Sequence, residues 1–220
     1  YDTAYADYRN RLYRYSISGN SWVSLSNPGV TVAAGSSIAY SGGDYIYATF
    51  GGNSTTFWRY SISGNTWAAM TVTPASIGLG GRLIYTGGDS LYLFRGYNGS
   101  AYTATFYRYS IANNSWSAMA DAPGLVYDGA ALTYPGGDYI YAFQGGGLTP
   151  FWRYSIASNQ WRAMTASPVT IGTGADLTYD GSGYIYAIRG GTSTGFYRYF
   201  VASNNYFNKL TDGFNIVGNV

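Results

Sequence analysis

Cysteine, histidine and glutamate are absent from this chain of 220 residues, and its twelve basic residues include a single lysine, Lys209. Imidazole and thiolate groups supply the usual catalytic bases, nucleophiles and zinc or copper ligands, so their absence excludes most hydrolase triads and transition-metal centres. We therefore expect no enzymatic activity, no metal and no cofactor. Without cysteine, disulfide bonds also give no indication of the cellular compartment.

Charge and long apolar runs are scarce as well. Charged residues make up 10% of the chain and the net charge is +2, which is too weak an electrostatic signal for binding nucleic acid. No apolar run reaches about 18 residues, so we expect no membrane insertion. Low charge together with many Ser, Thr, Asn, Gly and Tyr residues resembles secreted surface proteins, and we predict an extracellular or cell-surface location.

Glycine and tyrosine are abundant instead, with 31 and 26 residues, which favours strands and tight turns. The stretch FWRYSISGNTW at residues 57–67 recurs in five variants along the chain. The Arg of this motif is separated from the next by 45, 49, 45 and 45 residues, a period typical of propellers and other repeat arrays. The five arginines are Arg14, Arg59, Arg108, Arg153 and Arg198.

Each repeat is predicted to form four short strands separated by Gly, Asn, Ser or Pro. In the fourth repeat these strands lie in residues 129–137, 138–146, 151–158 and 159–164, where side chains alternate with period two. Four antiparallel strands per unit are typical of a propeller blade, so we expect one all-β domain, a β-propeller of about five four-stranded blades. Its expected parts are a partial blade 1 (1–29), blade 2 (30–74), blade 3 (75–123), blade 4 (124–168), blade 5 (169–211) and a tail (212–220).

The repeat resembles the kelch motif, in which a Gly pair follows the second strand, a Tyr lies in the third and a Trp in the fourth. The third repeat departs from it with Tyr97 in place of the second Gly, and the last repeat has Tyr206 in place of the Trp. The resemblance covers nearly the whole chain and implies a kelch-like propeller, which alone does not determine function. The matching residues are Gly51, Gly52, Tyr60 and Trp67; Gly96, Tyr109 and Trp116; Gly145, Gly146, Tyr154 and Trp161.

The two ends of the chain allow two interpretations. Residues 2–6 align with the second strand of the other repeats but have no first strand before them, and the apolar tail 212–220 has the length to supply one. The tail either pairs with the N-terminal segment and closes the ring, which removes an exposed sheet edge, or it acts as a donor strand for a neighbouring molecule. The first product is a monomer and the second a polymer.

Residues that recur in every blade are interpreted as structural. We expect the five recurrent arginines to stack on Tyr or Trp between blades, and the recurrent Tyr and Trp to fill the space between sheets. Asp44, Asp89 and Asp138 each follow a Gly pair, so we interpret them as turn residues.

Positions that differ between repeats are better candidates for binding, because loops carry function more often than scaffolds do. Four extra residues in the third repeat place Tyr97, Asn98 and Tyr102 on a lengthened loop. At the start of the corresponding loop, the repeats differ and carry candidate binding residues. These are Arg95, Gln144 and Arg189.

Two further candidates, Arg82 and Asp176, lie in predicted first strands, which line the central channel of a propeller. Asp128 precedes such a strand and would join them, so a glycosidase with paired carboxylates is the least favoured hypothesis. The triplets that begin at Asn53, Asn98 and Asn113 match the acceptor pattern for N-glycosylation.

Three hypotheses of function follow. The first is a non-enzymatic extracellular propeller that binds protein or forms a structural subunit of a surface assembly or filament, through self-association. The alternative is a carbohydrate-binding propeller that uses the aromatic and polar side chains near the lengthened loop. The third is the glycosidase.

Overall fold

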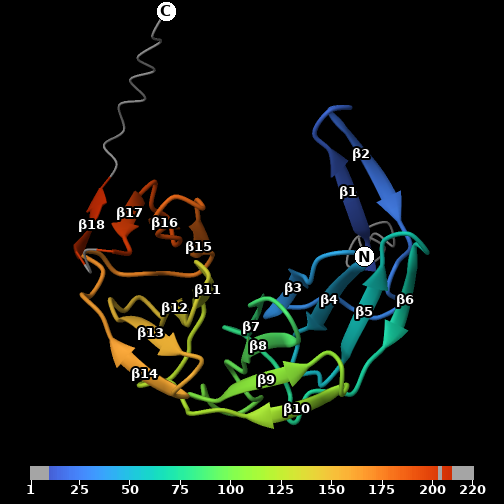
Figure 1. Cartoon of the computed structure of the whole chain (residues 1–220), viewed down its shortest axis with the longest axis horizontal. Coiled ribbons are helices and arrows are strands. Elements are labelled where there is room, and N and C mark those ends of the chain that lie inside the picture. Colours follow the sequence, from blue (N-terminus) through green and yellow to red (C-terminus); the bar gives the residue numbers. More distant parts are fainter. Residues whose placement is uncertain (1–9, 203–204, 210–220) are drawn as a thin grey trace, which may run out of the picture. The chain divides into compact units, whose positions relative to one another are not determined.

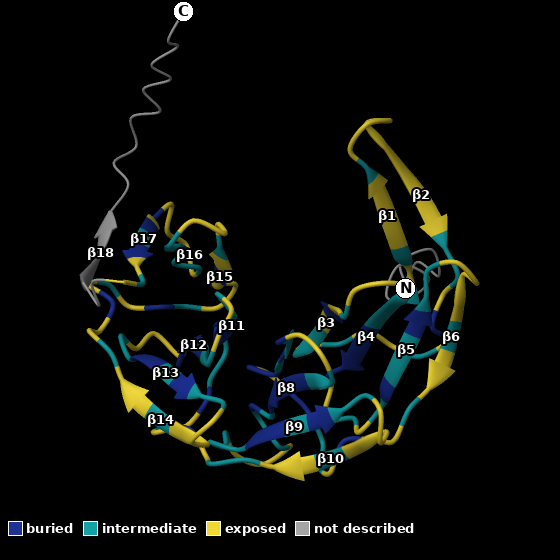
Figure 2. Cartoon of the chain, in the orientation of Figure 1, coloured by how far each residue is buried: buried dark blue, intermediate teal, exposed yellow. Residues whose placement is uncertain are grey.

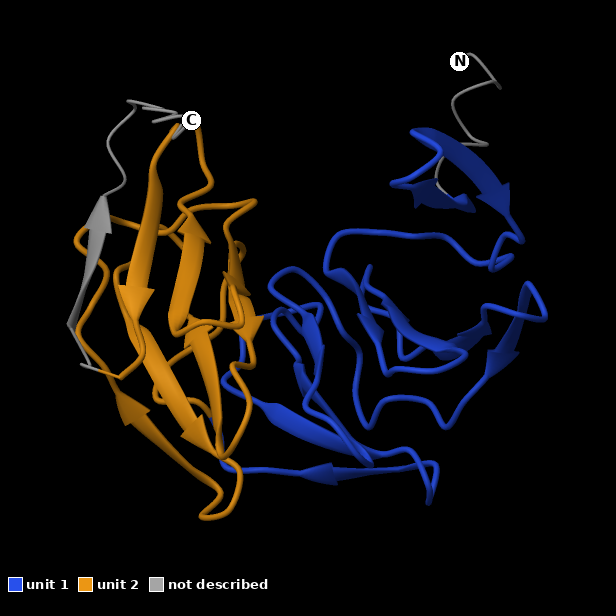
Figure 3. Cartoon of the chain, turned by 45° about the horizontal axis from the view of Figure 1, so that its top comes forward, with its two compact units in different colours: residues 1–121 blue, residues 122–220 orange. Residues whose placement is uncertain are grey.

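The computed structural model describes residues 10–202 and the backbone of residues 205–209 (Figure 1). Within these residues the regular elements are β-strands, which confirms the all-β prediction. None of the described segments is a helix long and apolar enough to cross a membrane. The chain divides into two compact units, Tyr1–Asp121 and Ala122–Val220, coloured separately in Figure 3.

The first unit contains a two-stranded hairpin and two four-stranded sheets. The hairpin consists of β1 (Leu12–Ser16) and β2 (Ser21–Leu25). Blade 2 consists of β3 (Ser36–Tyr40), β4 (Tyr45–Phe50), β5 (Phe57–Ser61) and β6 (Thr66–Ala69). Blade 3 consists of β7 (Arg82–Tyr85), β8 (Ser90–Phe94), β9 (Phe106–Ser110) and β10 (Ser115–Ala118).

The second unit contains two more four-stranded sheets of the same kind. Blade 4 consists of β11 (Ala131–Thr133), β12 (Tyr139–Phe143), β13 (Phe151–Ser155) and β14 (Gln160–Ala163). Blade 5 consists of β15 (Asp176–Tyr179), β16 (Tyr184–Ile188), β17 (Phe196–Phe200) and β18 (Asn205–Lys209).

Every blade is an antiparallel meander in which sequential strands pair. This confirms the predicted strands of repeats two to five. The first repeat is present as the hairpin β1–β2, and its other predicted strands, in residues 2–6 and in the tail 212–220, lie outside the described residues. The count of five blades and the closure of the ring therefore stay predictions.

An asparagine closes the turn between the third and fourth strand of the first four repeats. Its backbone is left-handed, with φ between 44° and 53°, a conformation that Asn tolerates better than other non-glycine residues. Its side-chain Oδ1 accepts a hydrogen bond from the Tyr hydroxyl of the third strand, at 2.5 to 2.8 Å. The pairs are Tyr15–Asn20, Tyr60–Asn65, Tyr109–Asn114 and Tyr154–Asn159.

The recurrent aspartates stabilise that same turn, across the sheet from their own position. In blade 4, Asp138 accepts hydrogen bonds from the Ser155 hydroxyl at 2.5 Å and from the backbone N–H of Ala157 at 2.6 Å. Asp44 and Asp89 make the equivalent bonds in blades 2 and 3. The Ser hydroxyl is the main reason why the pKa of each of these carboxyls lies below its ordinary value.

Three of the recurrent arginines stack on a Tyr of their own blade, so the prediction that they stack between blades was wrong. The guanidinium carbon of Arg59 lies 4.0 Å from the centroid of the Tyr45 ring on the neighbouring strand. The corresponding pairs are Arg153 on Tyr139 at 4.0 Å and Arg198 on Tyr184 at 4.9 Å. In blade 3 the Tyr is replaced by Ser90, and Arg108 donates to its hydroxyl at 2.9 Å.

Buried aromatic and aliphatic side chains fill the space between the two blades of each unit. Figure 2 colours the buried residues of the strands dark blue. In the second unit, burial raises the pKa of Tyr199 to about 12, with a further contribution from the neighbouring Tyr141. The predicted packing role of the recurrent tyrosines is thus confirmed inside each unit.

Substitutions of Asn114 test how much the turn contributes to the stability of the protein. The Oδ1 of Asn114 accepts the Tyr109 hydroxyl at 2.7 Å and the backbone N–H of Thr71, which follows β6 of blade 2, at 3.0 Å. Asn114→Ala should lose about 1 kcal/mol for each hydrogen bond and about 1–2 kcal/mol for the left-handed backbone. Asn114→Gly should lose only the hydrogen-bond part. Urea unfolding of both variants measures the difference, and equal losses would contradict the strain contribution.

Candidate interaction surface

A stacked Tyr–Phe pair lies on one face of every blade. The Tyr is on the second strand and the Phe on the third, at diagonal positions of the sheet register that allow long side chains to touch. The ring centroids are 5.4 to 5.7 Å apart and the ring planes differ by 20° to 24°. The pairs are Tyr47–Phe57, Tyr92–Phe106, Tyr141–Phe151 and Tyr186–Phe196.

Inside each unit the stacked pair of the first blade is covered by rings of the second. In the first unit, Tyr109 and Trp116 of blade 3 meet the Phe57 ring edge-on, both with centroids 4.8 Å away. In the second unit, Tyr199 of blade 5 meets Phe151 in the same manner at 5.0 Å. Phe57 and Phe151 are accordingly buried, so the following blade supplies the cover.

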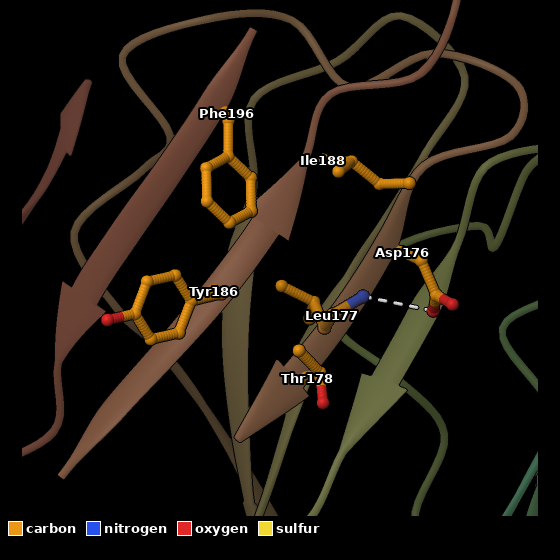
Figure 4. Close-up of a pocket in the computed structure, with 6 residues that line it drawn as sticks. All are labelled: Asp176, Leu177, Thr178, Tyr186, Ile188 and Phe196. Carbon is orange, nitrogen blue, oxygen red and sulfur yellow. Dashed lines mark hydrogen bonds between the residues drawn. The ribbon is translucent and has the colours of Figure 1, made fainter. Parts of the chain in front are cut away.

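The stacked pair of blade 5 has no such cover among the described residues. Phe196 is 40% exposed and Ile188 beside it is 47% exposed, whereas Phe57 is completely buried. Tyr186, Ile188 and Phe196 line a hollow of about 170 Å³ together with Asp176, Leu177 and Thr178 of β15, and Figure 4 shows the six side chains. We call Tyr186, Ile188 and Phe196 the acceptor face.

Asp176, at the start of β15, also lines this hollow. Its Oδ1 accepts a hydrogen bond from the backbone N–H of Leu177 at 3.0 Å, which Figure 4 marks with a dashed line. The hollow is otherwise mainly apolar. It therefore suits an aromatic or aliphatic side chain better than a charged ligand.

The hairpin β1–β2 carries a Tyr–Trp ring pair that is exposed among the described residues. Tyr15 and Trp22 have centroids 5.0 Å apart at an angle of 48°, the same geometry as Tyr109 and Trp116 in blade 3. Tyr15 is 42% exposed and Trp22 is 69% exposed. We call this hairpin, with Tyr15 and Trp22, the donor hairpin, because its ring pair matches the pair that covers Phe57.

The side chains at the start of the loop after the second strand, which differ between repeats, form hydrogen bonds with another loop of the same blade. Arg95 Nε donates to the carbonyl of Ser76 at 3.1 Å, and Gln144 Nε2 donates to the carbonyl of Leu125 at 2.9 Å. Arg189 Nε donates to the carbonyl of Thr170 at 2.8 Å, and its Nη2 donates to the Thr170 hydroxyl. Each side chain thus holds the loop that precedes the first strand of its blade, and a role in ligand binding stays a prediction.

The lengthened loop of blade 3 is folded into a small hairpin of its own. Tyr97 and Tyr102 form an isolated antiparallel bridge, and their ring centroids are 5.2 Å apart. Asn98 Oδ1 accepts the backbone N–H groups of Ser100 and Ala101, both at 2.8 Å. The three residues predicted as a binding loop are therefore brought together.

The predicted channel residues occupy the strands expected for them but belong to different units. Arg82 begins β7 in the first unit, and Asp176 begins β15 in the second. Asp128, half-buried, precedes β11. That these three residues face a central channel stays a prediction.

The three possible glycosylation sites differ in accessibility. Asn53 and Asn113 are exposed. Asn98 is half-buried, and its side-chain oxygen is occupied by the turn described above. Modification of any of them stays a prediction, with Asn53 and Asn113 better placed.

Comparison with known proteins supports the interpretation of the repeat. The kelch motif model matches residues 86–123, which span β8, β9 and β10 of blade 3. No curated protein matches the chain.

The exposure of the acceptor face predicts unequal effects of two equivalent substitutions. Phe151→Ala removes a covered ring and should cost about 3–5 kcal/mol of unfolding free energy. Phe196→Ala removes an uncovered ring and should cost about 1 kcal/mol or less. Urea unfolding in dilute solution measures both, and equal losses would show that Phe196 is covered in solution.

Proposed function

We propose that this chain, which is built of kelch-like propeller blades, is a non-enzymatic extracellular protein that acts through protein–protein contact, as a self-associating structural subunit. Kelch propellers commonly mediate contacts between proteins. The observation that supports this function is the pair of matching aromatic surfaces, the donor hairpin and the acceptor face, each exposed among the described residues of its own unit. A donor hairpin of one copy would cover the acceptor face of a second copy.

The contacts inside each unit support this match. Tyr109 and Trp116 cover the stack of Tyr47 and Phe57, and the donor hairpin carries an equivalent ring pair in the same geometry. A large aromatic ring buries about 150–250 Å², and stacked or edge-on ring pairs add about 0.5–1.5 kcal/mol beyond that burial. Two such rings form the centre of an interface, around which neighbouring side chains exclude water.

The geometry of this contact favours an assembly. The two surfaces are different, so the contact is heterologous, and a pair of bound copies still offers one free donor hairpin and one free acceptor face. Repetition produces a closed ring of copies or an open filament. The tail 212–220, which lies outside the described residues, would add a donor strand to the neighbouring copy in the same contact.

A mixing experiment tests the proposal. Trp22→Ala removes the cover from the donor hairpin, and Phe196→Ala removes the ring that it would meet. We expect the wild-type chain to form oligomers whose mass rises with concentration in light scattering, and each variant alone to be monomeric. An equimolar mixture of the two variants still contains one intact donor and one intact acceptor, so it should form a dimer and nothing larger.

Trp67→Ala is the matched control, because Trp67 is the equivalent ring of blade 2 and donates its indole N–H to the carbonyl of Ser26 inside the unit. This variant should be less stable but should still associate. A wild-type chain that stays monomeric at every concentration would overturn self-association, and would favour closure within one chain.

The lengthened loop supports a second candidate function, carbohydrate binding. The bridge between Tyr97 and Tyr102 holds two half-buried rings in a fixed arrangement beside Asn98, and such rings can stack on sugars. Glycan-array binding that is lost in Tyr97→Ala and Tyr102→Ala but kept in Phe196→Ala would support it. Absence of binding to any glycan would exclude it.

A further inference from the structure

The outer strands of blade 4 carry two arginines directly opposite each other. Arg153 on β13 pairs with Arg162 on β14 in the sheet register, a position in which the Cβ atoms of two residues are about 5 Å apart on one face. Like charges in opposed positions repel each other. The other blades avoid this arrangement, because the partner of the recurrent Arg there is Ala68, Ser117 or Asn208.

Arg153 and Arg162 both line a hollow of about 230 Å³ on this part of blade 4. Arg153 is held in place by stacking on Tyr139 at 4.0 Å, and Arg162 is exposed. Neutral donors complete the lining. They include the hydroxyl of Ser158 and the amide of Gln160, both on exposed residues.

The charge of the hollow is positive. Within the described part of the chain, neither Arg153 nor Arg162 forms an ion pair with a carboxylate. The Asp138 carboxylate lies near Arg153 but is bound by the Ser155 hydroxyl and the Ala157 N–H. One carboxylate beside two guanidinium groups leaves an excess of positive charge.

We propose that this hollow binds a small oxyanion, namely a carboxylate, sulfate or phosphate group, between Arg153 and Arg162. The planar guanidinium fork matches the oxygens of such groups in bidentate hydrogen bonds. A bound anion also removes the repulsion between the two arginines, which gives binding an advantage that the other blades do not offer. The site is separate from the acceptor face and does not depend on the proposed self-association.

Blade 2 provides an internal control. Its Arg59 stacks on Tyr45 at the same distance, 4.0 Å, as Arg153 does on Tyr139, but Arg59 faces the exposed Ala68. The two blades therefore carry the same stacked Arg–Tyr pair, with one arginine at this place in blade 2 and two in blade 4. Ala68→Arg should create in blade 2 the site that Arg162→Ala removes from blade 4.

The test is a titration of the full chain followed by NMR of the arginine Nε–Hε groups. The probes are acetate, sulfate and inorganic phosphate, each exchanged for chloride at constant ionic strength, so that a carboxylate is distinguished from a tetrahedral anion. We expect saturable shifts of Arg153 and Arg162 with at least one probe, in the millimolar range. Arg59 should show only a small linear drift.

Two variants make the test decisive, and both change exposed positions that should not affect folding. Arg162→Ala should weaken the response of Arg153 at least tenfold, and Ala68→Arg should give Arg59 a saturable response. Equal, linear shifts of Arg59 and Arg153 with all three probes would show general charge screening and would overturn the site.

Discussion

A four-stranded sheet has two faces, and one face of each described blade carries the Tyr–Phe stack. Inside a unit, this stack is buried by aromatic rings of the blade that follows. The edge-on contacts of Tyr109 and Trp116 with Phe57, and of Tyr199 with Phe151, show this cover in both units. Because the rings are large and apolar, their burial accounts for much of the stabilisation between blades. The same constraint leaves the Phe of a blade exposed where no described blade follows it, as at Phe196.

Polar bonds keep these rings in register. In blade 3, Asn114 of the third-to-fourth-strand turn accepts a hydrogen bond from the hydroxyl of Tyr109, and Asp89 before the second strand accepts one from the Ser110 hydroxyl at the end of the third. Blades 2 and 4 repeat both bonds. In blades 2 to 4 these bonds hold the third strand against its neighbours, and there the Tyr and Phe ring centroids are 5.4 to 5.7 Å apart. The recurrent Asp, Ser, Asn, Tyr and Trp thus stabilise the blade together, and other positions can differ between blades.

Arg162 is one of those positions, and it shows why part of the candidate chemistry could not be predicted from the sequence. Arg162 is the ninth residue after Arg153 along the chain, and only the register of β13 with β14 places them opposite each other. The recurrent arginines were predicted to be structural, but their stacking partner was placed in the neighbouring blade. The partner Tyr lies in the same blade, on the neighbouring strand, two residues from the position directly opposite the Arg. The contacts of Arg95, Gln144 and Arg189 with loop carbonyls could not be predicted either, because every residue has a backbone carbonyl and the sequence does not indicate which one accepts the hydrogen bond.

The sequence by itself determined the repeat, the four strands of each blade and the turns between them, because alternation of side chains and the placement of Gly and Asn are local properties. It also indicated which residues fill the space between sheets, through their recurrence in every repeat. Only the tertiary structure decided which aromatic rings are covered and which stay exposed, and which arginines stand together. Both depend on contacts between strands and between sheets, which the order of residues along the chain does not specify.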